Sequence, residues 1–173
     1  YMYRKGIYIS FLLFTFCSLI LQPSAQSHGY KFRHLTTSNG LSSDYVNVIF
    51  KDSRGFVWIG TDDGLNRYDG YTVTIFRNNP DDSTSLSDNE ILAIIEDDDG
   101  NLLIGTSKGG MNKFDYCSGR FIHHTCKPGT TDGISGNKVN VICRDTGNVF
   151  WLGTDNGLDK FYTHANKWEH YLP

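Results

Sequence analysis

Short apolar runs, each broken within a few residues by Gly, Asp or Asn, follow one another between residues 41 and 171. Their order is constant: an apolar run, a turn that contains Asp, a second apolar run that ends in Gly-Thr, and a turn that contains Gly. Runs this short are typical of β-strands, and none keeps a helical period over ten residues or more. The pattern therefore predicts an all-β chain.

An internal repeat sets the spacing of these strands. The segment at 41–52 returns at 86–97 and at 134–145, which is 45 and then 48 residues further along the chain. A repeat of this length that contains several short strands is typical of β-propeller blades. We predict three four-stranded antiparallel blades at about 41–77, 86–125 and 134–171, and strands of the first blade at about 45–51, 56–61, 65–69 and 72–77.

One predicted strand has no blade of its own. Residues 30–35 lead into the first blade as the last strand of each unit leads into the next. In a closed propeller such a strand completes the last blade, and known propellers have four to eight blades. We therefore expect residues 28–173 to form a partial propeller and the natural product to continue beyond residue 173. Without ring closure this segment is expected to be poorly soluble, because blade faces and strand edges stay exposed.

The first strand of each unit is apolar without strict alternation. This is visible at Val46, Val48 and Ile49, and again over residues 91–95. A strand of this kind is expected to be buried on both faces, as it is when one blade lies between two others.

Glycine and aspartate recur at fixed places. Gly60, Gly105 and Gly153 end the second strand of each unit, where a side chain would collide with the adjacent strand or the backbone must turn. The turn between the first and second strands begins with Asp, which can bond its own backbone. At 96–99 this turn resembles a calcium-binding run, but the equivalent turns lack its charge, so we interpret it as a turn.

The first 27 residues are predicted to be a signal peptide. Arg4 and Lys5 precede an apolar run of 15 residues from Ile7 to Leu21, and small or turn-forming residues follow. This order is typical of secretory signals, and the run is shorter than the roughly 20 residues of a spanning helix. Export to the periplasm is expected; retention of the segment as a membrane anchor stays open as the alternative.

Composition supports a packed fold with an ordinary surface. Hydrophobic residues make up 39% of the chain and aromatic residues 14%, which argues against disorder. The formal net charge of -3 becomes -5 without the predicted signal peptide, so no basic surface for nucleic acid is expected. Cys117, Cys126 and Cys143 are predicted to be free thiols without a metal role, because no cysteine or histidine shows the close pairing of zinc sites.

The motifs of the first unit resemble a known family. Asn39-Gly-Leu-Ser42 and the string from Asp52 to Gly70, with its Trp-Ile-Gly-Thr and Gly-Leu-Asn-Arg-Tyr-Asp, are similar to the two-component regulator propeller family. The resemblance covers about residues 30–171. One departure is Leu103, which stands where the other two units have Trp.

The resemblance implies a sensor. Family members are propellers outside the cytoplasmic membrane, followed by a β-sandwich, a transmembrane helix, a histidine kinase, a receiver and often a DNA-binding output, and many sense oligosaccharides. For this chain it implies an extracytoplasmic ligand-sensing module, itself no enzyme, of a full-length receptor anchored in the cytoplasmic membrane. The implied partners are an oligosaccharide or other small-molecule ligand, the remaining blades and downstream domains of the same chain, and a second copy in a homodimer. No cofactor is expected.

Blade topology points to a candidate ligand face. In an up-and-down blade, the loops that enter the first strand and the loops between the second and third strands share one face of the ring. They are the longer and more polar loops here, and carboxylates and amides can bond sugar hydroxyls. The candidate ligand-binding residues on this face are Asp62, Asp63, Lys108, Asp155 and Asn156. Solvated turns are the alternative for each, and no catalytic or metal-binding residue is predicted.

Two other functions stay open. The first is an exported propeller enzyme of the sialidase or lyase type, although the Asp52-x-x-Gly55 turn is one residue longer than the sialidase turn and no pair of carboxylates stands out. His123 and His124 are adjacent on a predicted strand and would point to opposite faces, so they cannot easily share a ligand. The second is a non-signalling interaction scaffold.

Overall fold

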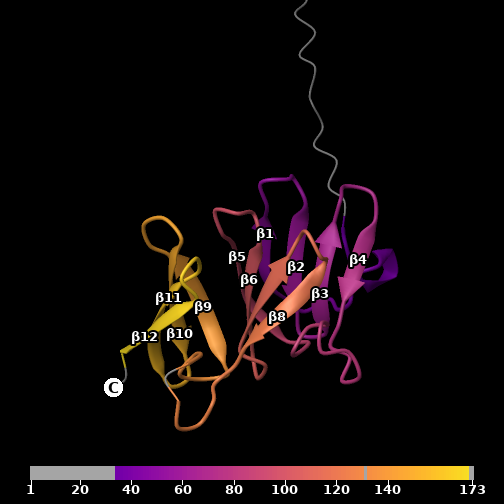
Figure 1. The fold of residues 1–173 in the computed structure, drawn as a ribbon. Helices are drawn as coiled ribbons and strands as arrows, with labels where there is room; N and C mark the ends of the chain where they lie inside the picture. Colours follow the sequence, from indigo (N-terminus) through magenta and orange to yellow (C-terminus); the bar gives the residue numbers. More distant parts are fainter. Residues whose placement is uncertain (1–33, 131, 172–173) are drawn as a thin grey trace, which may run out of the picture. The chain divides into compact units, whose positions relative to one another are not determined.

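The computed structural model describes residues 34–130 and 132–171, which form three four-stranded sheets (Figure 1). A short 3-10 helix, η1 (Thr37–Asn39), precedes them. Blade 1 consists of β1 (Val46–Lys51), β2 (Val57–Thr61), β3 (Gly64–Tyr68) and β4 (Val73–Phe76). Blade 2 consists of β5 (Ile91–Glu96), β6 (Leu102–Thr106), β7 (Met111–Asp115) and β8 (Arg120–His124). Blade 3 consists of β9 (Val139–Arg144), β10 (Val149–Thr154), β11 (Gly157–Tyr162) and β12 (Lys167–Tyr171).

Each sheet is an antiparallel meander in sequence order, so its strands are called A to D from first to last. The predicted all-β fold of three four-stranded antiparallel blades is confirmed, and the predicted strands of blade 1 agree with the observed ones to within one residue at either end. Within the described residues, no helix is long and apolar enough to cross a membrane. The predicted signal peptide, at 1–27, lies outside these residues.

The predicted strand at 30–35 falls mostly outside the described residues. Its described end, His34 and Leu35, is not in a strand, and the blade that it was predicted to complete is not among the described residues, so the strand stays a prediction. A strand is stable only where a neighbour accepts and donates its backbone hydrogen bonds, and no strand within the described part of the chain pairs with these residues.

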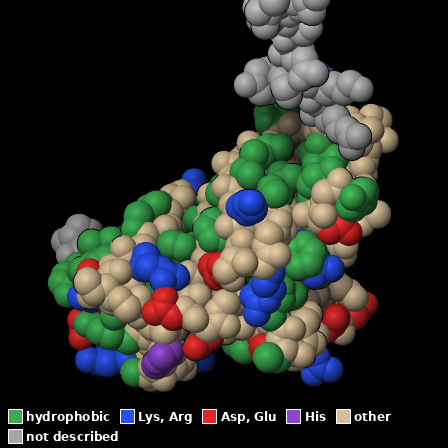
Figure 2. Space-filling model, turned by 90° about the horizontal axis from the view of Figure 1, so that it is seen from above, with side chains coloured by type: hydrophobic (Ala, Val, Ile, Leu, Met, Phe, Trp, Pro, Cys, Tyr) green, Lys and Arg blue, Asp and Glu red, His purple; other side chains and the backbone are tan. Residues whose placement is uncertain are grey.

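Burial of the A strands depends on their neighbours. In β5, Ile91 and Ile94 pack into the core shared with blade 1, while Ala93 packs into the core shared with blade 3. The prediction of burial on both faces therefore holds for β5. For β1 it is wrong: Ile49 is 66% exposed, because blade 2 is the only sheet packed against β1 within the described residues. On β9, Val141 is 48% exposed for the same reason, and Figure 2 shows hydrophobic side chains at the surface of this end.

The repeated strand-B glycines let neighbouring blades approach closely. A Cβ on Gly60 would lie 2.6 Å from a methyl group of Ile91, and one on Gly105 would lie 2.8 Å from a methyl group of Val139. Both contacts are to the A strand of the next blade. Gly153 has only a valine of its own blade at this distance within the described residues. Collision with the adjacent strand is therefore the reason for glycine at these positions.

The turns between strands A and B are held by Asp as predicted. In blade 1, the Asp52 carboxylate accepts hydrogen bonds from the backbone N–H of Arg54 (3.0 Å) and of Phe56 (2.8 Å), and Gly55 follows with φ +94°. A left-handed φ of this kind favours glycine. The Asp97 carboxylate makes the equivalent bonds in blade 2.

A buried polar cluster joins blade 1 to blade 2. Asp52 accepts further hydrogen bonds from the indole N–H of Trp58 (2.8 Å) and from the hydroxyl of Tyr116, which belongs to blade 2. Burial alone would raise the pKa of Asp52, but the hydrogen bonds from Tyr116, Trp58 and the backbone outweigh it and hold the pKa below its ordinary value. The same burial and the Asp52 contact raise the pKa of Tyr116 well above its ordinary value, so this hydroxyl stays a donor.

Candidate functional site

The B–C turns and the loops that enter strand A meet on one face of the blades. Between blades 1 and 2, the backbone N–H of Gly64 donates to the carbonyl of Asn89 (2.8 Å). Between blades 2 and 3, the N–H of Gly110 donates to the carbonyl of Asn137 (2.9 Å). The two loop sets that the sequence assigned to one face are therefore in direct contact there.

Three of the five predicted ligand-binding residues use their side chains to brace these loops. Asp63 forms an ion pair with Arg77 at 2.9 Å. Asp155 accepts a hydrogen bond from the backbone N–H of Lys138 (3.3 Å). The side-chain amide of Asn156 donates to the carbonyl of Ser135 (2.9 Å). These contacts support the solvated-turn interpretation for the three residues.

The other two predicted residues present their side chains to solvent. Asp62 and Lys108 are exposed, and no hydrogen bond or ion pair joins either side chain to the residues that the structure describes. Lys108 is held through its backbone, whose N–H donates to the Asp88 carboxylate (2.8 Å). A carboxylate and an ammonium group are thus available on the loop face, one on blade 1 and one on blade 2.

A larger feature, which the sequence did not reveal, lies between blades 2 and 3. A cavity of about 850 Å³ is bounded by β8, the loop that enters β9 and the β11–β12 hairpin. A second cavity of about 440 Å³ adjoins it. Both are lined by Ile122, His124 and Asn166, so they run together. We call the two cavities together the rim groove. None of the five residues predicted on the loop face lines it.

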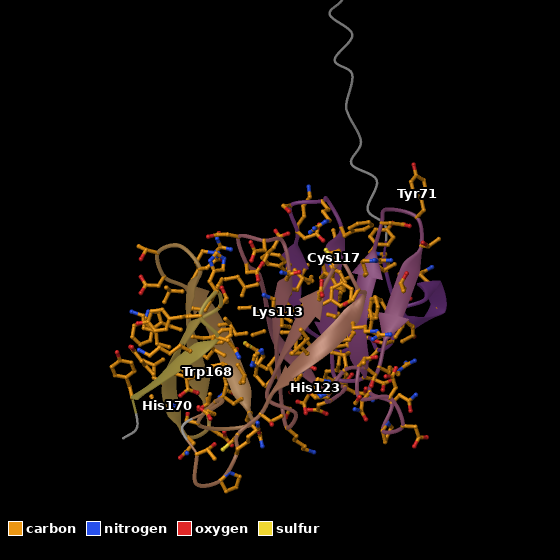
Figure 3. All side chains as sticks on the ribbon, viewed as in Figure 1. Tyr71, Lys113, Cys117, His123, Trp168 and His170 are labelled. Carbon is orange, nitrogen blue, oxygen red and sulfur yellow. The ribbon has the colours of Figure 1, made fainter. Side chains whose placement is uncertain are left out.

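Aromatic rings form the floor of the rim groove. The Trp168 indole stacks on Phe161 with ring centroids 4.1 Å apart and the planes 22° from parallel. The imidazole of His124 packs against both, at 5.2 Å from Phe161 and 5.7 Å from Trp168. His123 and Trp168 belong to the two blades that face each other across the groove (Figure 3). Because Phe161 is buried and Trp168 is half-buried, the indole presents the open part of this stack.

The position of His124 determines its protonation. Burial lowers the pKa of His124 to about 4, and the neighbouring Lys113 and His123 act in the same direction. The imidazole is therefore neutral at physiological pH. The sequence prediction that His123 and His124 point to opposite faces agrees with their contacts, since His123 instead approaches the carbonyl of Ser85 (2.7 Å).

Polar groups occupy both ends of the rim groove. Lys127 and Asp132, from the loop that enters β9, and Lys167, at the start of β12, line the larger cavity. The smaller cavity carries Asp99, Asn101, Lys113, Asp115 and Cys117. The groove is thus a mixed surface, aromatic at its floor and polar along its length.

Cysteines and acidic side chains of the described residues are not gathered into a metal site. Cys117, Cys126 and Cys143 are free thiols. In the acidic turn at 96–99, Glu96 accepts a hydrogen bond from the backbone N–H of Ser53 (2.9 Å), and Asp97 pairs with a lysine. No group of three or more His, Cys, Asp or Glu within the described ranges could hold a metal ion.

One cluster contains the residue types of a hydrolase triad but not its geometry. The hydroxyl of Ser135 donates to Asp159 (3.0 Å), and the imidazole Nδ1 of His170 lies 2.7 Å from the other oxygen of the same carboxylate. In a nucleophilic triad the serine bonds the imidazole, which acts as the base. Here the carboxylate lies between the two, and the cluster joins the entry loop of blade 3 to its strands.

Comparison with known proteins identifies the repeat in two of the blades. A family model described as "Two component regulator propeller" matches residues 40–63 and 85–108, which comprise the end of the entry loop, strands A and B and the start of the B–C turn in blades 1 and 2. Blades 1 and 2 therefore carry the repeat of the two-component regulator propeller family. The resemblance inferred from the Trp-Ile-Gly-Thr motif is therefore confirmed.

The relatives of this propeller are signalling proteins. It is 46% identical over 78 residues to "Histidine kinase P4" of Formosa agariphila, a match that covers 45% of the chain and 6% of that protein. The extracellular domain of a hybrid two component system from B. thetaiotaomicron superposes with a TM-score of 0.75 at 27% identity, over 81% of the chain and 20% of that domain. The extracellular domain of a one component system from the same organism gives 0.63 at 28% identity, over 78% of the chain and 19% of that domain. The propeller thus spans about a fifth of the solved domains that it resembles.

Proposed function

We propose that this propeller is the extracytoplasmic, ligand-sensing module of a two-component receptor, and that its ligand is an oligosaccharide. The observation that carries the proposal is the shared fold with extracellular domains of signalling systems, combined with the family match in blades 1 and 2. Export to the periplasm is part of the proposal and agrees with the predicted signal peptide. The kinase to which the propeller would report lies in the downstream part of the full-length receptor.

The chemistry of the loop face supports a sugar ligand. Asp62 and Lys108 hold a carboxylate and an ammonium group in solvent on a face whose loops are braced by hydrogen bonds and ion pairs. Such groups donate hydrogen bonds to sugar hydroxyls or accept hydrogen bonds from them. A set of loops fixed on a rigid scaffold is also a common kind of binding site. The sensing step we propose is a shift between two receptor arrangements, driven by the higher affinity of the ligand for one of them.

Thermal stability of the complete mature protein tests the proposal. The protein is titrated with hexasaccharides of cellulose, xylan, mannan, laminarin and polygalacturonate, and its melting temperature is followed. A ligand that binds only the folded state adds about 2.7 kcal/mol at a concentration of 100 Kd, so at least one sugar should raise the melting temperature. A melting temperature that no sugar moves would remove the support for oligosaccharide sensing.

A further inference from the structure

We infer that the rim groove between blades 2 and 3 binds an oligosaccharide chain of several sugar units, an inference that rests on the proposed function and names a place for its ligand. The groove is distinct from the loop face on which the sequence placed the candidate residues. Three observations carry the inference: the difference between the two blade junctions, the open aromatic floor, and the polar side chains along the groove.

At the junction between blades 1 and 2, aromatic side chains fill the space at the rim. There Phe76, Phe114 and Phe121 pack together with ring centroids 5.0–5.7 Å apart. Strand pairing places His124, Phe161 and Trp168 at the equivalent positions of the next junction. Phe121 is 5% exposed, whereas Trp168 is half-buried. The same three positions thus form a closed core at one junction and an open floor at the other.

The entry loops explain this difference. The loop between blades 1 and 2 covers β8, because the N–H of Phe121 donates to the carbonyl of Thr84 (2.9 Å) and His123 contacts the carbonyl of Ser85 (2.7 Å). The next loop lines the larger cavity through Thr125, Lys127, Asp132 and Gly133. The second junction therefore leaves space for a ligand where the first is filled by protein.

The Trp168 indole is suited to hold a sugar ring. Phe161 supports one part of the ring system and His124 packs beside it, so the indole is fixed before any ligand arrives. Fixed aromatic side chains give a large contact area and lose little conformational entropy on binding. The apolar C–H face of a pyranose ring can pack on such a surface while its hydroxyls stay available to polar neighbours.

Those polar neighbours are present along the groove. The side-chain hydroxyl of Thr125 and the side-chain amide of Asn166 make no hydrogen bond with any residue that the structure describes, and both line the larger cavity. Asn166 lies at φ +46°, a left-handed conformation that Asn tolerates better than most residues, and it also lines the smaller cavity. Lys127 and Asp132 add charged groups at the loop end. Hydroxyl, amide and charged groups beside an aromatic platform fit the alternating C–H and O–H surface of a sugar chain.

The length of the groove favours a chain over a single sugar. The two cavities join at Ile122, His124 and Asn166 and extend from the loop that enters β9 to the turn after β7. A volume of about 850 Å³ for the larger cavity alone lies in the upper range of small-molecule sites. A ligand that fills both would contact blades 2 and 3 together.

Isothermal titration calorimetry with the complete mature protein tests the site. The probes are the five hexasaccharides named above and their disaccharides. Ile122→Trp places a large side chain where the two cavities join, and its parent residue is already 50% exposed, so the core is unaffected. Ile75→Trp is the matched control, because Ile75 is an exposed isoleucine on β4, the outermost strand of blade 1, away from the groove. Trp168→Ala removes the aromatic platform, and its fold is checked by circular dichroism.

The expected results distinguish a failure of the rim groove as the binding site from a failure of oligosaccharide sensing as the function. Ile122→Trp and Trp168→Ala should weaken the Kd for the recognised hexasaccharide about tenfold or more, as loss of an anchoring aromatic contact does, while Ile75→Trp should bind like the wild type. The disaccharide should bind more weakly than the hexasaccharide. Wild-type affinity in Ile122→Trp would overturn the rim groove as the site and leave oligosaccharide sensing intact. A disaccharide as tight as its hexasaccharide would overturn the extended ligand, and a wild-type protein that binds no probe would contradict the proposed function itself.

Discussion

At the scale of single residues, one position of strand C carries a neutral amide in blades 1 and 2 and a carboxylate in blade 3. Asn66 and Asn112 occupy it in blades 1 and 2, and each accepts a hydrogen bond from the backbone N–H of the serine in its entry loop and donates its amide to that serine's hydroxyl. Blade 3 has Asp159 there, fully buried, with Ser135 donating to it from both backbone and hydroxyl. The imidazole Nδ1 of His170 lies 2.7 Å from the other oxygen of this carboxylate.

This substitution pattern predicts the response of Asp159 to mutation. Asp159→Asn should keep both contacts with Ser135, as the asparagines of blades 1 and 2 do, and should lower the free energy of unfolding by about 1 kcal/mol or less. Asp159→Leu removes every polar contact and should cost about 2–4 kcal/mol, because the serine and the histidine lose a buried partner. Urea denaturation of the complete mature protein at pH 7 measures both. Equal losses for the two variants would show that the hydrogen bonds to Ser135 are not what stabilises this position.

Protonation of His124 gives a prediction for stability against pH. Burial lowers its pKa to about 4 in the folded protein, while the unfolded chain has the ordinary value of 6.5. Between these values the unfolded state binds more protons, so the free energy of unfolding should fall as the pH is lowered from about 6.5 to 4, by up to about 3 kcal/mol. Above pH 6.5 this contribution is constant.

Comparison of the wild type with His124→Phe isolates the effect. Phenylalanine is the residue of blade 1 at the equivalent position, and it keeps the ring packing against Phe161 and Trp168 without a titrating group. The difference in unfolding free energy between the two proteins should change across this pH window and stay flat above it. A difference that is independent of pH from 4 to 7 would contradict the assigned role of His124.

At the scale of elements, the glycine at the end of strand B limits how close two blades can come. Alanine at Gly60 or Gly105 would place its methyl group within 2.6–2.8 Å of the A strand of the next blade. Because a packed interior cannot give way without moving backbone or side chains, each substitution should cost about 1–3 kcal/mol in unfolding free energy. Thermal or urea denaturation of the complete mature protein measures the loss.

Gly153→Ala is the comparison within the same chain. Within the described residues its methyl group would meet only a valine of blade 3, so the contacts seen here predict a smaller loss than for Gly60 or Gly105. We propose, from the repeat, that the remaining blades of the receptor continue the ring. A loss at Gly153 as large as at the other two glycines would indicate that another blade packs against this face, and a smaller loss would argue against such a neighbour.

At the scale of the whole molecule, the described blades expose apolar surface at both open faces. Val46 and Ile49 are 42% and 66% exposed on β1, and Val141, Leu158 and Tyr171 are 48%, 41% and 50% exposed on blade 3. Apolar strands that face solvent are a typical cause of association between chains. We therefore predict that residues 28–173 expressed alone aggregate during size-exclusion chromatography.

The variant Ile49→Lys with Val141→Lys tests the cause of this aggregation. It places one charge on each open face without touching the cores between blades, since both parent side chains are exposed. Its aggregated fraction should be clearly smaller than that of the unchanged segment. A monodisperse, cooperatively melting monomer formed by the unchanged segment would contradict the prediction.

Much of the fold could be predicted because its determinants are local. The Asp that holds each A–B turn and the Gly that follows it act within four residues, so the strands of blade 1 were placed to within one residue. The glycine at 60 or 105 was recognised from its recurrence, although the side chain that it avoids belongs to the next blade. Burial of β1 was mispredicted, because it depends on which sheets lie beside the strand rather than on the strand itself.

For the candidate sites too, some features could be predicted from the sequence and others only from the tertiary structure. The sequence by itself determined the all-β blades, the loop face and the resemblance to a known repeat, because repeated turns and strand order are properties of each unit. Only the tertiary structure decided that Asp63, Asp155 and Asn156 brace loops, since their partners lie in other segments of the chain. It alone revealed the rim groove, because His124 and Trp168 are 44 positions apart and meet only when two blades pack side by side.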